Sequence, residues 1–205
     1  MPRLPPRVFL LSPARAGGER MGLLLRPNAG FAMAHEFQRE GLALGEVFQF
    51  ASGLYFRGKL AYARAFARPP RGTVGALAIV PGRGLMDVET NFTVADLREV
   101  AEVPVDVRDQ RYREPLVRDA TALAGALGKG GEVVLLGSIA TGKYADILLQ
   151  IFGDRLLFPP DFVGRGDMSR GGLLLRCVRA GMELPYASLR GAVRHGPRPP
   201  RLPRL

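Results

Sequence analysis

Short apolar runs alternate along the chain with stretches whose apolar residues recur at helical spacing. The clearest case lies in residues 132–152, EVVLLGSIATGKYADILLQIF. The apolar run Val133–Leu136 has the length and the β-branched start of a buried strand. Small residues fill 137–142, and an i, i+3, i+4, i+7 apolar pattern from Tyr144 to Ile151 then predicts a helix with one apolar face. Gly153 can supply the left-handed residue that ends this helix.

The same pattern predicts further elements on both sides of this segment. Strands are expected at residues 7–12, 73–80, 156–158 and 173–178, and helices at 28–38, 54–67, 93–100 and 115–127. Asn28 is the expected cap of the first helix, and Pro115 suits the start of the last. Thr93 and Asp96 have the spacing of a capping box. Residues 45–50 fit either a helix or a strand, and residues 159–172 are expected to form a loop.

This alternation predicts an α/β fold. We expect a single three-layer domain over residues 7–190, with a mainly parallel sheet of four or five strands and helices on both faces. Residues 1–6 form a Pro-rich lead-in. Residues 191–205 are rich in Pro and Arg and have few apolar residues, so we expect a basic, disordered tail.

Small, polar or basic residues follow three of the predicted strands. These segments are Ser12–Arg15, Pro81–Gly84 and Gly137–Thr141. Parallel strands end at one edge of a sheet, where ligands bind in such folds. We therefore expect Ser12, Arg15, Arg83 and Ser138 to approach one another around a ligand.

The segment Gly137–Lys143 fits the first seven positions of a phosphate-binding P-loop, G-x-x-x-x-G-K. Tyr144 stands where that loop needs Ser or Thr for magnesium, and no later apolar strand ends in Asp. A nucleotide triphosphatase is therefore the less favoured interpretation. Contact of a phosphate or nucleoside with Gly137, Ser138 and Thr141 is favoured, because a helix start offers free N–H groups. The alternative is a tight strand–helix connection with Lys143 in solvent.

Other polar residues are weaker candidates. Arg165 and Arg170 could close over an anion, or they could belong to a solvated surface connection. Asp87 and Asp106 are candidates for acid–base catalysis, although most such residues form turns or ion pairs. Tyr55, Arg57 and Lys59 begin the helix at 54–67 and could reach a ligand or only cover the helix surface. Tyr55, Lys59, Tyr62 and Phe66 form a second row at helical spacing. The sequence contains no metal-ligand cluster, and no cofactor is expected.

The composition limits the partners and the compartment. The 205 residues carry a net charge of +10, which favours polyanionic partners, although only three of the 29 basic residues are lysines. There is no apolar run of about 20 residues, so no membrane partner is expected. The single cysteine, Cys177, rules out an internal disulfide, so a reducing cytoplasm is the simplest location. Cys177 is expected to be a buried thiol in the strand at 173–178. The oligomeric state cannot be deduced.

Residues 79–96, IVPGRGLMDVETNFTVAD, resemble part of a bacterial and phage family in which a strand precedes Ser-Ala-Lys-Tyr-Gly-Leu and an acidic turn. The match covers Arg83–Asp87 and the strand before it, and extends loosely over residues 103–127 and the strand after them. A similar segment occurs in the domain beside the catalytic unit of archaeosine-type tRNA-guanine transglycosylase relatives, and those domains resemble the uracil-DNA glycosylase fold. Ser12–Arg15 is also similar to the Ser-Pro-Ala-Lys opening of a bacterial peroxide-stress family.

This resemblance implies a three-layer α/β fold and a nucleobase-related theme. It implies no particular activity, because Gly82-Arg83 replaces Lys-Tyr and no water-activating motif of the glycosylases is present. We therefore expect a protein that binds a nucleotide, a nucleobase or a nucleic acid at the strand ends. The chemistry would concern an N-glycosidic bond or a modified base. The alternative is a non-catalytic module that docks onto nucleic acid or another protein.

Overall fold

The computed structural model describes residues 4–14, 18–200 and 202. Its strands are β1 (Arg7–Leu11), β2 (Leu42–Ala43), β3 (Ala76–Val80), β4 (Gly84–Asp87), β5 (Asn91–Phe92), β6 (Glu132–Leu136), β7 (Leu156–Phe158) and β8 (Ala187–Ser188). Its α-helices are α1 (Glu19–Leu25), α2 (Ala32–Glu40), α3 (Leu44–Ser52), α4 (Leu54–Phe66), α5 (Val94–Ala101), α6 (Gln110–Leu127), α7 (Gly142–Phe152) and α8 (Asp167–Ala180). Two short 3₁₀ helices, Gly153–Arg155 and Pro160–Phe162, flank β7.

Six of the described strands form the main sheet, in the order β4-β3-β1-β6-β7-β8. The central strands β3, β1, β6 and β7 are parallel, while β4 and β8 pair antiparallel at the two edges. The expected four or five strands was therefore an undercount, because the edge strands β4 and β8 were not predicted. Their sequences are short and lack a clear apolar alternation.

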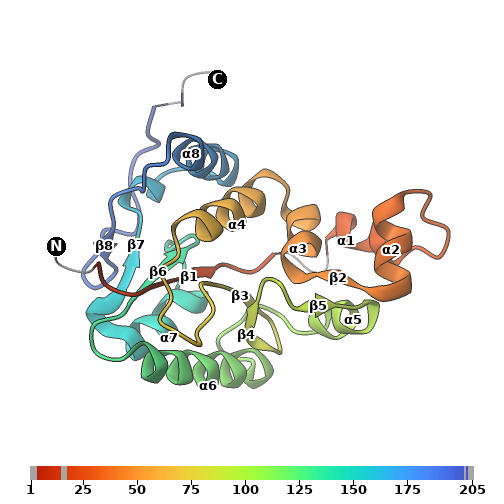
Figure 1. Ribbon diagram of the computed structural model, residues 1–205, viewed down its shortest axis with the longest axis horizontal. Coiled ribbons are helices and arrows are strands. Elements are labelled where there is room, and N and C mark those ends of the chain that lie inside the picture. The colour runs from red at the N-terminus through yellow and green to blue at the C-terminus, as the bar shows by residue number, and fades with distance from the viewer. Residues whose placement is uncertain (1–3, 15–17, 201, 203–205) are drawn as a thin grey trace.

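Helices cover both faces of this sheet, as the sequence predicts. Val8 and Leu10 of β1 pack with α6 and α7, while Phe9 and Leu11 pack in the core beneath α4. Figure 1 shows α4 and α8 above the sheet and α6 and α7 below it. Every residue of β1 is buried, and residues 8–11 after Arg7 are all apolar, without polar alternation.

The helices α1, α2 and α3 extend to one side of the sheet with α5 and the small β2–β5 ribbon (Figure 1). The sequence did not predict α1. It also placed the start of α2 too early, because the N-cap is Phe31 and not Asn28. Residues 45–50, which fitted either element, lie in the helix α3. The Thr93–Asp96 capping box is confirmed: the Thr93 N–H donates to Asp96 Oδ2 at 2.8 Å, and the Asp96 N–H donates to Thr93 Oγ1 at 3.3 Å.

Two other predictions are wrong. Pro115 lies inside α6, which begins at Gln110 after the cap Asp109, whose side chain accepts from the Arg111 N–H. Residues 167–180, expected to be loop and strand, form the helix α8. Cys177 therefore lies on a helix, where it is half-buried.

The contact between α4 and α8 depends on two glycines. A Cβ atom on Gly58 would lie 2.7 Å from the carbonyl oxygen of Gly171, and one on Gly171 would lie 2.6 Å from the carbonyl oxygen of Leu54. The two backbones are therefore in direct contact, which only glycine permits. This contact fixes α8 against the helix that carries Lys59.

The two ends of the parallel strands differ in their surroundings. At the amino end of β1, Arg7 pairs with Glu132 and Glu183, and the hydroxyls of Tyr62 and Tyr186 lie 2.6 Å apart. These contacts hold the segment with Glu183 and Tyr186 against the sheet.

In the part of the chain that the structure describes, no helix is long and apolar enough to cross a membrane.

Candidate functional site

The carboxyl ends of β1 and β6 lie side by side and hold three of the predicted site residues. Leu11 pairs with Leu136, and the Ser12 N–H donates to the Leu136 carbonyl at 3.1 Å. A Cβ atom on Gly137 would lie only 2.7 Å from Ser12 Cβ. Ser12, Gly137 and Ser138 are thus brought together, as the parallel sheet predicts.

These strand ends open into a hollow of about 360 Å³, which we call the Ser12 cavity. Its walls come from the ends of β1 and β6, from α3 and α4, and from the first turns of α7 and α8. The lining residues are Ser12, Pro13, Ala51, Ser52, Tyr55, Lys59, Ser138, Tyr144 and Asp167. The cavity thus combines hydroxyls, phenol rings, one amine and one carboxylate.

Lys59 of α4 is the most unusual of these residues, because its side chain is buried in the protein. Its exposed fraction is 1%. The Nζ atom contacts the Ser12 carbonyl oxygen at 2.8 Å and Ser12 Oγ at 2.9 Å. It also lies 4.6 Å from the ring centroids of Tyr55 and Phe56. The amine is therefore held in one place, with the Ser12 hydroxyl within hydrogen-bond distance.

Burial changes the charge state of this amine. It lowers the pKa of Lys59 from 10.5 to about 7, because an ammonium loses its hydration there. The Asp167 carboxylate raises this pKa, and the Arg170 guanidinium lowers it further. At neutral pH a large fraction of Lys59 is thus the free amine, whose lone pair can accept a proton.

Two tyrosine side chains line the cavity, and their hydroxyls differ in hydrogen bonding. Tyr144 Oη donates to the Ser138 carbonyl at 2.8 Å. The Tyr55 hydroxyl is buried and has no hydrogen-bond partner among the described residues. Burial raises the pKa of both phenols, so both stay protonated at neutral pH. Tyr55 therefore retains a hydroxyl donor that no described protein atom uses.

The predicted arginines of the α8 region support the protein's own backbone. Arg170 is buried and donates to the Phe162 carbonyl from Nε at 3.1 Å and from Nη2 at 3.0 Å. Its Nη1 lies 3.2 Å from Asp167 Oδ1. Arg165 donates to the Asp161 carbonyl at 2.8 Å. Neither arginine lines the Ser12 cavity, whereas Asp167 does.

Arg83, which was expected in the same site, lies elsewhere. It pairs with Asp96 at 2.8 Å and also with Glu99, so two acids already neutralise its charge. Asp87 accepts a hydrogen bond from the Glu89 N–H at 3.0 Å in the turn after β4. Neither Arg83 nor Asp87 lines the Ser12 cavity. Arg15 lies outside the described residues.

Asp106 and Lys143 line a second hollow, of about 660 Å³, at the start of α7. Hydrogen bonds from Arg108 lower the pKa of Asp106 to about 2, so this carboxylate is a poor proton donor at neutral pH. Thr141 is the N-cap of α7, but its side chain makes no capping hydrogen bond. Ser138 and Lys143 thus border different hollows, and the segment does not surround one phosphate site as a P-loop does.

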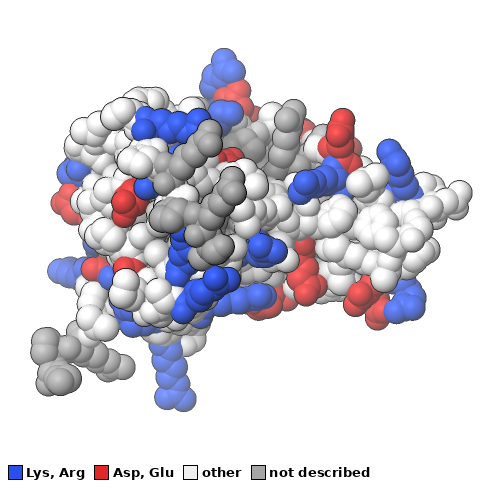
Figure 2. Space-filling model, turned by 90° about the horizontal axis from the view of Figure 1, so that it is seen from above, with Lys and Arg blue, Asp and Glu red and all other residues white. Residues whose placement is uncertain are grey.

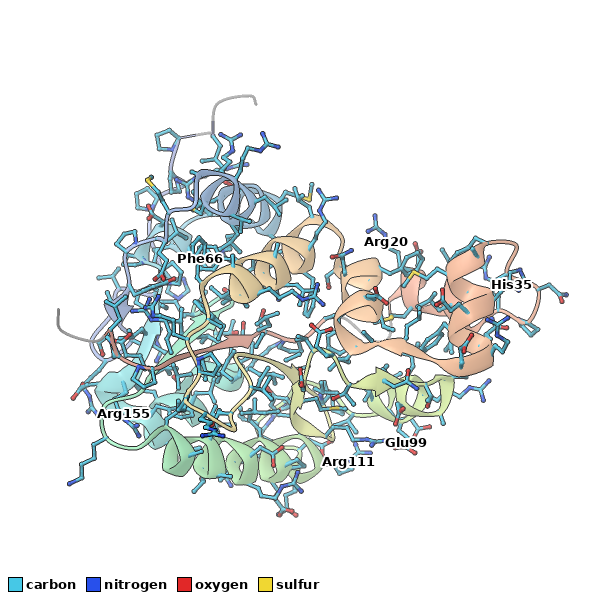
Figure 3. All side chains as sticks on the ribbon, viewed as in Figure 1. Arg20, His35, Phe66, Glu99, Arg111 and Arg155 are labelled. Carbon is cyan, nitrogen blue, oxygen red and sulfur yellow. The ribbon has the colours of Figure 1, made fainter. Side chains whose placement is uncertain are left out.

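A third hollow, of about 550 Å³, lies among α1, α2 and α3 and is lined in part by Arg20, Glu36 and Phe50. Figure 3 shows Arg20 and His35 in this part of the molecule, away from the sheet. Its lining includes no buried charged side chain. No group of three or more His, Cys, Asp or Glu that could hold a metal ion occurs in the described ranges. The Ser12 cavity is therefore the candidate functional site.

Sequence reasoning named Tyr55 and Lys59 only as residues that could reach a ligand or cover the helix surface, and it did not name Tyr144 as a site residue. A usable signal was present, because Lys59 interrupts a row of aromatic residues at helical spacing, and such a row faces the core. A charged residue on a buried face needs a partner, which is here Ser12. Tyr144 gave no such signal, because its position depends on how α7 meets β1.

Comparison with known proteins adds no further identification. No protein-family model matches this chain. No curated protein and no solved structure matches it.

Proposed function

We propose that the protein is an enzyme that binds a nucleoside-type ligand, free or within a nucleic acid, in the Ser12 cavity. In this proposal Lys59 and Ser12 transfer a proton during the reaction. The observation that carries the proposal is the buried Lys59 amine, 2.9 Å from Ser12 Oγ at the edge of an open cavity. Perturbed titratable groups in clefts are typical of active sites.

The lining favours a base and a sugar over a bare phosphate. Tyr55 and Tyr144 offer ring faces and hydroxyls, and Ser12, Ser52 and Ser138 add small hydroxyls. Such groups match the planar base and the hydroxyl groups of a nucleoside. The Asp167 carboxylate, which pairs with Arg170, would accept hydrogen bonds from sugar hydroxyls, and the cavity lining includes no arginine to hold a phosphate.

Proton transfer is the step that the Lys59–Ser12 pair supports. A group is most effective as an acid or a base when its pKa lies near the working pH. The pKa of Lys59, lowered by burial to about 7, meets that condition. Cleavage of an N-glycosidic bond and modification of a base both require a proton to move at the ligand, so both fit this pair.

The test is a binding titration of nucleobases, nucleosides and nucleotides by calorimetry and native mass spectrometry. We expect at least one nucleoside to bind the parent protein. The variant Ser52→Phe, which fills the cavity, should weaken that binding about tenfold or more. The matched control is Phe50→Leu on the same helix, outside the cavity lining. If no compound binds, or if Ser52→Phe binds equally well, the proposal is wrong.

Docking onto nucleic acid is the second candidate, and the net charge of +10 favours it. Two observations weaken it. Arg190 and Arg194 of the C-terminal region pair with Asp154 and Asp146 of this chain. Figure 2 shows basic and acidic side chains interspersed on the face that carries α8. Docking predicts that removal of residues 191–205 abolishes binding of nucleic acid, whereas an enzyme would keep its nucleoside ligand. Disorder of this segment stays a prediction.

A further inference from the structure

We infer that Ser12 is a nucleophile, that Lys59 is its general base, and that the reaction is transfer or hydrolysis of an acyl group carried as a neutral ester. The inference rests on the proposed function only in taking the Ser12 cavity as the ligand site. It names the reacting atom, the base and the kind of bond that reacts.

The geometry around Ser12 fits an activated hydroxyl. A neutral amine has one lone pair and two N–H bonds. Nζ donates to the Ser12 carbonyl oxygen at 2.8 Å and to Ser12 Oγ at 2.9 Å. Once it is neutral, it can keep the first bond and accept the Oγ proton across the second. The first contact fixes the amine, and the second activates the hydroxyl. Pro13 restricts the backbone of Ser12 to extended conformations, which limits the directions the hydroxyl can take.

The groups that face Lys59 come from four elements. Tyr55 and Phe56 lie on its own helix, and Ser12 follows β1. The first turn of α7 contributes Tyr144 to the same cavity. The Asp167 and Arg170 side chains of α8 act on the amine with opposite sign. Lys59 is uncharged when it serves as the base, and the Arg170 guanidinium already pairs with Asp167. The described lining then offers no unpaired positive charge to an anionic phosphate, so a neutral ester is favoured.

The reaction proceeds in two balanced steps. The Ser12 Oγ–carbon bond forms as the Oγ proton passes to Lys59 Nζ, and negative charge moves onto the carbonyl oxygen of the ester. The ester C–O bond then breaks, and the leaving alkoxide takes the proton from Lys59. Water next attacks the acyl-serine and gives a proton to Lys59, which returns it to Ser12 Oγ as the carboxylic acid leaves. An acceptor alcohol in place of water gives acyl transfer.

A purely structural role for Lys59 makes different predictions. An ammonium that only held the end of β1 would leave Ser12 no more reactive than an ordinary serine. The test therefore measures the reactivity of Ser12 with an alkyl fluorophosphonate, in which fluoride leaves as the Oγ–P bond forms. Intact mass and peptide mapping on the full-length protein give the adduct and its position.

We expect one adduct, on Ser12. Its rate of formation should rise about tenfold per pH unit below pH 7 and level off above it, as the amine loses its proton. Ser12→Ala should abolish the adduct, and Lys59→Met should slow its formation by about 100-fold or more. The matched controls Ser188→Ala and Lys129→Met should react at the parent rate, because neither residue lines the Ser12 cavity.

Three results would overturn the inference: no adduct on the parent protein, an adduct that persists in Ser12→Ala, or a parent rate without the rise toward pH 7. The parent pH profile needs no variant, so the test holds even if Lys59→Met does not fold. Nucleoside titration of the same samples separates the two proposals. Nucleoside binding without an adduct refutes only the nucleophile, and an adduct without nucleoside binding refutes only the ligand class.

Discussion

Replacement of Lys59 by Met should make the protein more stable near neutral pH and less stable near pH 10. In the parent, burial lowers the pKa of Lys59 from 10.5 to about 7. Between these pH values the unfolded chain keeps a proton that the folded chain has released. The free energy of unfolding of the parent therefore rises with pH by about 1.36 kcal/mol per pH unit. Below pH 7 both states are protonated, and the contribution is constant.

Summed between pH 10.5 and pH 7, this slope means that Lys59 lowers the free energy of unfolding of the parent by an amount on the order of 5 kcal/mol at pH 7. The destabilisation vanishes above pH 10.5. Lys59→Met removes it. The same change leaves the Ser12 carbonyl and hydroxyl without their partner, at a cost of about 1–3 kcal/mol. We therefore expect the variant to be more stable by about 2–4 kcal/mol at pH 7, with the difference reversing in sign before pH 10.5.

Urea unfolding followed by circular dichroism at pH 7 and at about pH 9.5 gives this difference directly. Shifts of other titrating groups cancel between variant and parent. The variant's advantage should shrink by about 3 kcal/mol between the two pH values. The control Lys129→Met, at an exposed lysine, should show no such change. A difference between Lys59→Met and the parent that stays constant with pH would mean that the folded protein keeps the ammonium charged, and the reasoning would fail.

Three further changes test the fold and the site. Gly58→Ala should lower the free energy of unfolding in urea by about 2–3 kcal/mol, because its Cβ would lie 2.7 Å from the Gly171 carbonyl oxygen. The control Gly125→Ala, with open space around its Cβ, should raise that free energy by up to about 1 kcal/mol. Thr93→Ala removes the capping box of α5 and should destabilise the protein by about 1 kcal/mol, which is measured as a lower thermal midpoint of unfolding. An unchanged midpoint would show that the cap does not stabilise the protein. Lys143→Met should leave nucleoside affinity unchanged within about twofold, because Lys143 lines a different hollow. The parent should show no magnesium-dependent triphosphate hydrolysis, and hydrolysis that is present in the parent but lost in this variant would restore the P-loop interpretation.

The central layer of the fold was predictable from local patterns. The strands β1, β3 and β6 contain the continuous apolar runs 8–11, 76–80 and 133–136, and such runs are typical of strands buried on both faces. The helix from Gly142 to Phe152 ends at Gly153, as predicted, and its φ of 57° is one that glycine adopts readily, although its ψ of −131° differs from that of a left-handed helical residue. These predictions succeed because each element carries its own period and its own end signal.

The helix α8 could not be predicted in the same way. A short apolar run such as Leu173–Val178 cannot be told from a buried helix segment by periodicity. The glycines before it indicate a loop in sequence, but Gly171 is needed for backbone contact with Leu54 of α4. That requirement comes from tertiary packing, which no local pattern shows.

The candidate site was predictable in its place and not in its chemistry. Sheet topology correctly brought Ser12 next to Ser138. Arg83 was misplaced because its acidic partners, Asp96 and Glu99, come from the following helix. Lys59 acquires its properties from burial, a quantity that depends on the whole packed molecule.

Lys59 also has an evolutionary consequence. A lysine that destabilises the fold at neutral pH should be lost readily under random substitution, because Met or Leu at that position gives a more stable protein. Its persistence would then require selection for a reaction. Descendants of a common ancestor that still perform the chemistry should share Lys59 and Ser12 as a pair, and lineages that have lost the chemistry should lose the amine first. Reconstruction of ancestral proteins, with stability and probe reactivity measured on each, would date the gain of the activity by the appearance of this one side chain.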